Sequence, residues 1–216
     1  MIKKVYVYVE GPSDKYAMET LLHPLIEQKK HDGVTVDFLS EGSKEALLEK
    51  VPKRTINIIL NEPNSFVVVI PDLYPRDLCF KHATYDELKE GILSRFNSAL
   101  RDKHINESDT LLKRFKIFCF KYDLESLILA SIESLKLYLG VNELHVTWNI
   151  PVEDQNHEEP PKNIIKCLFS NYGKKYNETF DAPLILSMSS YEDITDRCRQ
   201  CFKPFVDFLK NLPEND

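Results

Sequence analysis

The stretch Val5-Tyr-Val-Tyr-Val-Glu10-Gly11-Pro12-Ser13-Asp14 decides the fold. Its β-branched and aromatic half predicts a strand over residues 2–9, and the Gly-Pro pair ends that strand at once. Apolar side chains then recur at helical spacing through Lys30, with Ser13 as the predicted N-cap. Strand, tight turn and helix in this order predict a β-turn-α unit with Glu10 at the carboxyl edge of a sheet.

A second apolar run, Phe66-Val-Val-Val-Ile-Pro71-Asp72, also ends in an acid. Prolines bound this run, and its continuous apolar character is typical of a central parallel strand that is buried on both faces. Ligands of open α/β sheets bind at the carboxyl ends of the strands. Because carboxylates at the ends of two neighbouring strands can share one divalent metal ion, this pair of acids predicts a site.

The rest of the chain alternates strand and helix patterns. This order predicts an α/β fold with a mostly parallel sheet and helices on both faces. We expect a core domain over residues 1–140 and a C-terminal extension over 141–216, whose polar, proline-bearing loop 149–161 we interpret as a mobile loop or the neck of an insertion. The further predicted elements are strands at 34–39 and 115–120, a helix capped by Ser43 that runs through Val51, and helices at 85–101, 124–139, 162–172 and 191–209.

Composition narrows the class of protein. The 216 residues are 43% hydrophobic, which suffices for one sizeable core, and the net charge is −6. This negative net charge argues against a protein that coats nucleic acid, because such binding needs many contacts from Lys and Arg to phosphate. A local basic groove, or metal ions bound by the acids, is compatible with the same net charge. The apolar runs are far shorter than the roughly 18 residues of a membrane helix, so we expect a cytoplasmic protein.

The cysteines, the single histidines and the one tryptophan give weaker signals. An odd, scattered cysteine set indicates reduced thiols, and Cys198-x-x-Cys201 lacks a second ligand pair, so we favour packing over zinc binding. His157 and the other isolated histidines are interpreted as structural or solvated, and Trp148 as a packing residue. The cysteines are Cys79, Cys119, Cys167, Cys198 and Cys201.

The first acidic group is Glu10, Asp14 and Asp72. Gly11 between the first two lets a phosphate approach closely because it lacks a Cβ. Mg²⁺ (or Mn²⁺) prefers oxygen ligands, keeps several waters and is held by one or two carboxylates together with substrate phosphate. The alternative interpretation is that acids at strand ends only face solvent or cap helices.

A third strand end carries Asp123 and Glu125. Both are candidate metal ligands, and the alternative is that Asp123 caps a helix while Glu125 lies in its first turn, where the helix dipole favours acids. Ser43 and Lys44, at the start of another helix, are candidates for binding phosphate. The full Walker pattern is missing, so an NTPase is not expected.

Four short motifs in this order resemble a known group of proteins. The chain is similar to the TOPRIM fold of topoisomerases, primases and the nucleases of overcoming-lysogenization-defect proteins, and more closely to the TOPRIM-like family named domain of unknown function 4276. The resemblance covers most of the chain. Its motifs are Glu10-Gly-Pro-Ser-Asp14, Asp72-Leu-Tyr74, Tyr122-Asp-Leu-Glu125 and Pro160-Pro-Lys162.

The resemblance implies roles for particular residues. Glu10 corresponds to the acid that serves acid/base chemistry or metal binding, and Asp72 to the first acid of an Asp-x-Asp pair that holds Mg²⁺. Tyr74 stands where the second acid is expected, and a phenol is a poor Mg²⁺ ligand, which puts a topoisomerase-like or primase-like site in doubt. Where the family tends to His-Glu, this chain has Tyr122-Asp123, while Glu125 is kept.

The function that the resemblance implies is a Mg²⁺-dependent nuclease or phosphodiesterase. Metal would be held by Glu10, Asp14 and Asp72, with Asp123 or Glu125 completing the set. The substrate would be DNA or RNA, and hydrolysis or transfer of a nucleotide is the alternative that differs only in substrate. Family members often lie beside genes for ABC-type or SMC-like ATPases, as in prokaryotic defence modules, so the resemblance implies an ATPase partner, and we leave a homo-oligomer open. The alternative is a catalytically inactive scaffold that binds a partner ATPase or a nucleotide.

Overall fold

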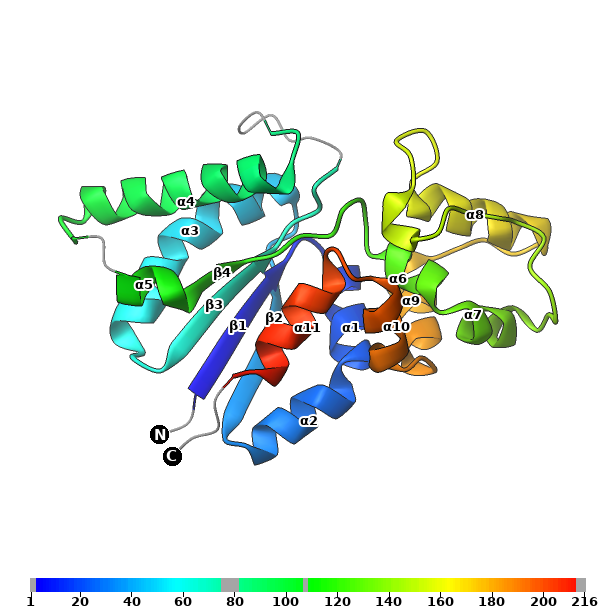
Figure 1. Ribbon diagram of the computed structural model, residues 1–216, viewed down its shortest axis with the longest axis horizontal. Coiled ribbons are helices and arrows are strands. Elements are labelled where there is room, and N and C mark those ends of the chain that lie inside the picture. Colours follow the sequence, from blue (N-terminus) through cyan, green and yellow to red (C-terminus); the bar gives the residue numbers. More distant parts are fainter. Residues whose placement is uncertain (1–2, 75–81, 107–108, 213–216) are drawn as a thin grey trace.

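A parallel four-stranded sheet, in the order β2-β1-β3-β4, forms the centre of the protein (Figure 1). The structure is a computed structural model and describes residues 3–74, 82–106 and 109–212, so Pro75 and Cys79 lie outside the described residues. The strands are β1 Lys3–Val9, β2 Val34–Ser40, β3 Ser65–Ile70 and β4 Phe115–Ile117. All three strand pairings are parallel, as the sequence predicts.

Helices cover both faces of this sheet. Figure 1 shows α3 and α4 on one side, α1, α2 and α11 on the other, and α6 to α10 gathered near one end. The helices are α1 Pro12–Leu21, α2 His23–His31, α3 Lys44–Asn61, α4 Tyr85–Asp102, α5 Asp109–Arg114, α6 Glu125–Ala130, α7 Ile132–Leu139, α8 Pro161–Asn171, α9 Glu178–Ser187, α10 Tyr191–Arg197 and α11 Phe202–Lys210.

The alternation of side chains along the strands explains the two layers. Val7 of β1 and Val68 of β3 face a core formed with α1, α2 and α11. Tyr8 and Val69 face the opposite core, formed with α3 and α4. Because both faces are buried, the central strands are apolar at nearly every position. The predicted α/β class, with a mostly parallel sheet and helices on both faces, is confirmed.

Several predicted helices are interrupted. The expected helix over 14–30 is two helices, α1 and α2, which meet at Leu22 just before Pro24, a residue that has no N–H to continue the hydrogen-bond ladder. Ser13 is not the N-cap of α1: the helix begins at Pro12 after Gly11, as suits a proline at the first helical position. The predicted helix over 124–139 is divided at Ser131 into α6 and α7.

Strand β4 ends earlier than predicted, but its alignment with β3 continues. The N–H of Phe120 donates to Pro71 O at 3.1 Å, and the N–H of Leu73 donates to Phe120 O at 2.6 Å. Asp72 and Phe120 form an isolated parallel bridge. The chain therefore stays in register up to the acids that follow both strands.

The C-terminal part packs on the same core as the sheet. Phe205 of α11 lies edge-on to Phe38 of β2, with ring centroids 6.3 Å apart. Buried residues of α8, α9 and α11 belong to the same hydrophobic cluster as those of β1 and α1. Two helices, α5 and α9, are not among the predicted elements. The boundary at residue 140 stays a prediction.

None of the helices within the described residues is both long enough and apolar enough to cross a membrane.

Candidate active site

The parallel register brings the ends of all four strands to one edge of the sheet. Val9 pairs with Ile70, so Glu10 and Asp72 follow neighbouring strands. At the end of β2, the N–H of Gly42 donates to Glu10 O at 2.7 Å. Gly42 has a φ of 89°, a backbone conformation that favours glycine, and this turn leads directly into α3.

A polar cavity of about 210 Å³ lies at this edge. It contains every candidate site residue from the sequence except Lys44. Its lining is Glu10, Gly11, Ser13, Asp14, Gly42, Ser43, Asp72, Asp123, Leu124, Glu125, Lys162 and Glu178. We call it the acidic cavity. The tertiary structure thus brings together carboxylates that are far apart in the sequence.

Backbone amides orient the first acids. Glu10 Oε1 accepts a hydrogen bond of 3.0 Å from the N–H of Asp72, which ties the end of β1 to the end of β3. Asp14 Oδ2 accepts from the N–H of Gly11 at 2.8 Å. One oxygen of Asp14 therefore closes the turn before α1.

Asp123 and Glu125 are held from the C-terminal part. Asp123 Oδ2 accepts from the N–H of Lys162 at 3.2 Å, whereas Asp123 Oδ1 is buried and has no hydrogen-bond partner within the protein. Glu125 is 3% exposed, and its Oε1 accepts from the hydroxyl of Tyr176 at 3.1 Å. A buried carboxylate oxygen without a donor is costly as an anion, so this position favours a proton shared with the neighbouring Glu125 carboxyl or a bound cation.

Burial and mutual repulsion raise the pKa values of these acids. Desolvation, followed by the charges of Glu10, Asp14 and Asp123, raises the pKa of Asp72 well above its usual range. Desolvation and then the charge of Glu125 raise the pKa of Asp123 to about 8. The pKa values of Asp14 and Glu125 are also raised, in each case chiefly by desolvation. A cluster of this kind favours either protons or a cation.

Two lysines bring positive charge to the cluster. Lys162 forms an ion pair with Glu178, and its pKa is raised because the bond to Glu178 and the charges of Glu125, Glu178 and Asp123 outweigh the effect of burial. Lys44 does not line the cavity. Its Nζ donates to Leu73 O at 3.4 Å. Its positive charge partly offsets the rise in the pKa of Asp72.

The donor set suits a hard cation. Within the described ranges, no three His, Cys, Asp or Glu side chains converge closely enough to form a complete metal site. A Mg²⁺ ion typically needs only one or two carboxylates, with waters and substrate phosphate supplying the other ligands. Asp72, Glu10 and the unpartnered oxygen of Asp123 fit that requirement, because all are carboxylates facing one cavity.

The alternative role as a helix cap holds for one candidate, Ser43, and not for Asp123. Ser43 does cap α3, since its Oγ accepts from the N–H of Ala46 at 3.1 Å. Asp123 does not cap α6, because its side chain accepts instead from the N–H of Lys162. Glu125 lies in the first turn of α6, and its buried carboxylate also lines the cavity. Capping and cavity lining therefore coexist at Ser43.

A second cavity, of about 380 Å³, adjoins the acidic one and shares Asp72, Asp123 and Lys162 with it. The other lining residues are Tyr74, Tyr122, His157, Pro160 and Asn163. We call it the aromatic cavity. Tyr74, which stands where the resemblance expects a second acid, is a wall of this cavity and does not line the acidic one.

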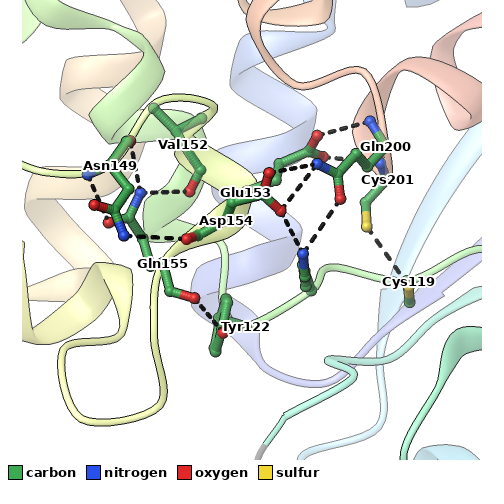
Figure 2. Close-up of polar contacts among 10 residues, drawn as sticks. Cys119, Tyr122, Asn149, Val152, Glu153, Asp154, Gln155, Gln200 and Cys201 are labelled. Carbon is green, nitrogen blue, oxygen red and sulfur yellow. Dashed lines mark hydrogen bonds and ion pairs between the residues drawn. The ribbon is translucent and has the colours of Figure 1, made fainter.

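The thiols within the described residues are free. Cys119, Cys167, Cys198 and Cys201 form no disulfide, and Cys119 Sγ lies 3.8 Å from Cys201 Sγ (Figure 2). Cys198 is fully buried, which fits the packing role predicted for it.

Lys162 and Glu178 are cavity residues that sequence reasoning did not select. Lys162 ends the Pro160-Pro-Lys162 motif, which was a usable signal. Glu178 begins α9, whose apolar pattern is interrupted by Asp181 and Pro183, so that neither the helix nor its first residue stood out.

Fold and site together define a parallel α/β protein with an acidic cavity at the carboxyl ends of its strands. The chain belongs to the family described as Domain of unknown function (DUF4276), whose model matches residues 9–210. The predicted family is therefore confirmed. No curated protein matches the chain.

Solved structures with a similar course of the chain include C-terminal regions of OLD proteins. The region from Burkholderia pseudomallei has 16% sequence identity and a TM-score of 0.47, and the match covers 97% of this chain and 100% of that one. The region from Xanthomonas campestris pv. campestris has 12% identity and a TM-score of 0.45, with 95% and 96% covered. The likeness is distant.

Proposed function

We propose that the protein is a metal-dependent phosphodiesterase of TOPRIM type that cleaves DNA or RNA. The observation that carries this proposal is the acidic cavity, where carboxylates from three strand ends meet beside Lys162. Phosphodiester cleavage needs positive charge at the phosphate and an oriented water. Both requirements suit a cavity of carboxylates that favours a cation.

Glu10, Asp72 and Asp123 would hold Mg²⁺ (or Mn²⁺), with Asp14 and Glu125 completing the acidic surround. When bound, the ion supplies charge that stabilises the phosphate as negative charge develops in the transition state. The protein's own groups orient this site: the N–H of Asp72 fixes Glu10, and Tyr176 fixes Glu125. Lys162 and Ser43 lie where a phosphate oxygen could bind, and Gly11 leaves its approach open.

The second candidate function is a catalytically inactive scaffold that binds a nucleotide or a partner ATPase. Tyr74 favours it, because the Tyr74 hydroxyl donates to Ala83 O at 2.7 Å and so does not replace the missing acid as a ligand. A defence role alongside an ABC-type or SMC-like ATPase, a cytoplasmic location and homo-oligomer formation rest on the family resemblance, and we keep them as proposals.

Nuclease assays with an isosteric variant test the proposal. We would incubate the protein with single-stranded DNA, double-stranded DNA and RNA in Mg²⁺ or Mn²⁺, with and without an ABC-type or SMC-like ATPase of the kind that the family resemblance implies. Asp72→Asn keeps the shape of the side chain and should reduce cleavage by about 10³-fold or more, because the lost metal interaction contributes several kcal/mol. Asp37→Asn is the matched control, since Asp37 is an exposed residue of β2.

Calorimetric titration of Mg²⁺ separates the two candidates independently of cleavage. Binding that Asp72→Asn weakens and Asp37→Asn leaves unchanged supports the enzyme. Full activity of Asp72→Asn would reject Asp72 as a metal ligand, and no cleavage in any arm together with no metal binding would move the assignment to the scaffold.

A further inference from the structure

The aromatic cavity is formed by three rings from three separate segments. Tyr74 follows β3, Tyr122 follows β4, and His157 lies in the loop 149–161. The ring centroid of Tyr74 is 4.4 Å from that of His157 and 5.4 Å from that of Tyr122. His157 and Tyr122 are 5.7 Å apart. These three rings therefore form one mutually contacting cluster.

Hydrogen bonds to the backbone fix both tyrosine rings. The Tyr74 hydroxyl donates to Ala83 O at 2.7 Å, and the Tyr122 hydroxyl donates to Gln155 O. Both hydroxyls are thus engaged with the protein. All three rings line the cavity, and the two tyrosine rings, held by these bonds, need little ordering when a ligand binds.

The loop that carries His157 is anchored just before this residue. Figure 2 shows Gln155 beside Asn149 and Val152, where Gln155 Nε2 donates to Asn149 O at 2.8 Å and to Val152 O at 3.1 Å. Glu153 accepts from the N–H groups of Gln200 at 2.7 Å and Cys201 at 2.8 Å. His157 is exposed, so its ring is accessible beside an anchored segment.

We propose that the aromatic cavity binds the unpaired base of a nucleotide whose phosphate lies in the adjoining acidic cavity. This inference rests on the proposed function, because it takes the acidic cavity as the phosphate site. The two cavities share Asp72, Asp123 and Lys162, so a ligand can occupy both at once. Aromatic rings bind bases by stacking, which accepts any base because every base has a π-face.

The base must be unpaired because its faces are covered within a duplex, where neighbouring bases stack on them. A volume of about 380 Å³ falls in the range of small-molecule sites, roughly 300–1,000 Å³. Asn163, at the cavity wall, carries an amide that can both donate to and accept from a base edge. Substitution of an acid by Tyr74 thus gives the site a stacking surface where the resemblance expects a metal ligand.

Binding assays in the Asp72→Asn background avoid cleavage during the measurement. Fluorescence anisotropy would compare labelled single-stranded DNA, single-stranded RNA and duplex DNA of one sequence, each in Mg²⁺. Single strands should bind more tightly than duplex. Tyr74→Leu and His157→Ala should each weaken single-strand binding roughly 5- to 100-fold, the range measured for removal of one stacking ring.

Two control variants keep this test specific. Tyr74→Phe retains the ring and should bind nearly as tightly as the parent, which shows that a loss in Tyr74→Leu comes from the ring. His145→Ala should have no effect, since His145 is another exposed histidine, stacked 6.0 Å from Tyr172, and lines neither cavity. Circular dichroism would verify that each variant folds.

Oligonucleotides carrying 2-aminopurine report stacking directly, because its fluorescence falls when it stacks on an aromatic ring. We expect quenching on binding, and relief of that quenching in Tyr74→Leu. Nucleoside monophosphates added as competitors distinguish the source of the ligand: displacement near the concentration needed for an oligonucleotide indicates a free nucleotide, and displacement only in large excess indicates a strand.

Equal binding of duplex and single strand, or unchanged affinity in both Tyr74→Leu and His157→Ala, would overturn this inference. That result leaves the proposed function intact if Asp72→Asn still abolishes cleavage. Conversely, ring-dependent binding in a protein that cleaves nothing would support the base site and reject the enzyme. The two failures are therefore distinguishable.

Discussion

The acidic cavity and the aromatic cavity share three residues but are built in different ways. Glu10 and Asp72 lie just after β1 and β3, so the sheet register places them, whereas Asp123 and Glu125 lie beyond β4 and are held by Lys162 and Tyr176. Two of the aromatic rings also follow strands, but His157 comes from a loop anchored by Gln155 and Glu153. The difference teaches that the sheet determines where the proposed chemistry occurs, while the C-terminal part determines what can bind beside it.

After Asp72, the largest effect is expected at Asp123, where activity and stability should change in opposite directions. Asp123→Asn should lower cleavage by about 10²–10³-fold, on the scale of losing one group that stabilises transition-state charge. The same change should raise the Tm of the metal-free protein near neutral pH, because folding then no longer requires the uptake of a proton at a carboxyl whose pKa burial raises to about 8. Cleavage assays and thermal unfolding of one preparation test both effects. Retained activity, or a lowered Tm, would contradict this account.

Glu153 tests the anchoring of the loop. Its Oε1 accepts from the N–H groups of Cys201 and Phe202, and its Oε2 from that of Gln200. Glu153→Ala leaves these donors without their acceptor and should cost about 1.5–3 kcal/mol, measured by urea unfolding. Glu158→Ala, in the exposed part of the same loop, is the control and should cost little. A Glu153→Ala variant as stable as this control would show that the loop is not held in this way.

The raised pKa values predict a pH dependence. The pKa of Asp123 is about 8 in the folded protein, against about 4 when unfolded, so the folded state binds more protons between these values. Stability of the metal-free protein should therefore fall as pH rises through this window. Each pKa unit between the folded and unfolded states corresponds to about 1.4 kcal/mol in the free energy of unfolding.

Thermal unfolding at about pH 5.5 and about pH 8.5 measures this slope. Asp123→Asn should flatten it, and excess Mg²⁺ should oppose the fall at the higher pH, because a cation favours the ionised carboxylates. A Tm that rises with pH in metal-free buffer would show that the acids are not buried together as described.

The smallest expected effect separates capping from phosphate binding at Ser43. Ser43→Ala removes the cap of α3 and should cost about 1 kcal/mol. Ser43→Asp keeps a capping oxygen and should retain stability, but its added charge should weaken binding of a nucleic acid phosphate. Unfolding and anisotropy measurements on both variants test this pair. Equal binding in Ser43→Asp and the parent would leave Ser43 as a cap only.

Much of the sheet and of the acidic cavity could be predicted from short stretches of the sequence. The strand ending at Glu10 and the strand ending at Asp72 are visible as apolar runs closed by Gly or Pro, and parallel order follows from the helices between them. The points at which helices are interrupted were harder to predict from the sequence. The predicted helix over 191–209 is instead α10 and α11, because the Glu153 carboxylate binds the N–H groups at the start of α11. No local pattern shows that contact.

The sequence by itself determined the α/β class and the acids at three strand ends, since periodicity and turn residues are properties of neighbours along the chain, and its short motifs carried the family resemblance. Only the tertiary structure decided that Lys162 and Glu178 join those acids, and that Tyr74 and Tyr122 contact His157. The physical reason is that these residues meet through packing of α8, α9 and the loop 149–161 against the sheet edge, and burial between distant segments leaves no periodic signal in the sequence.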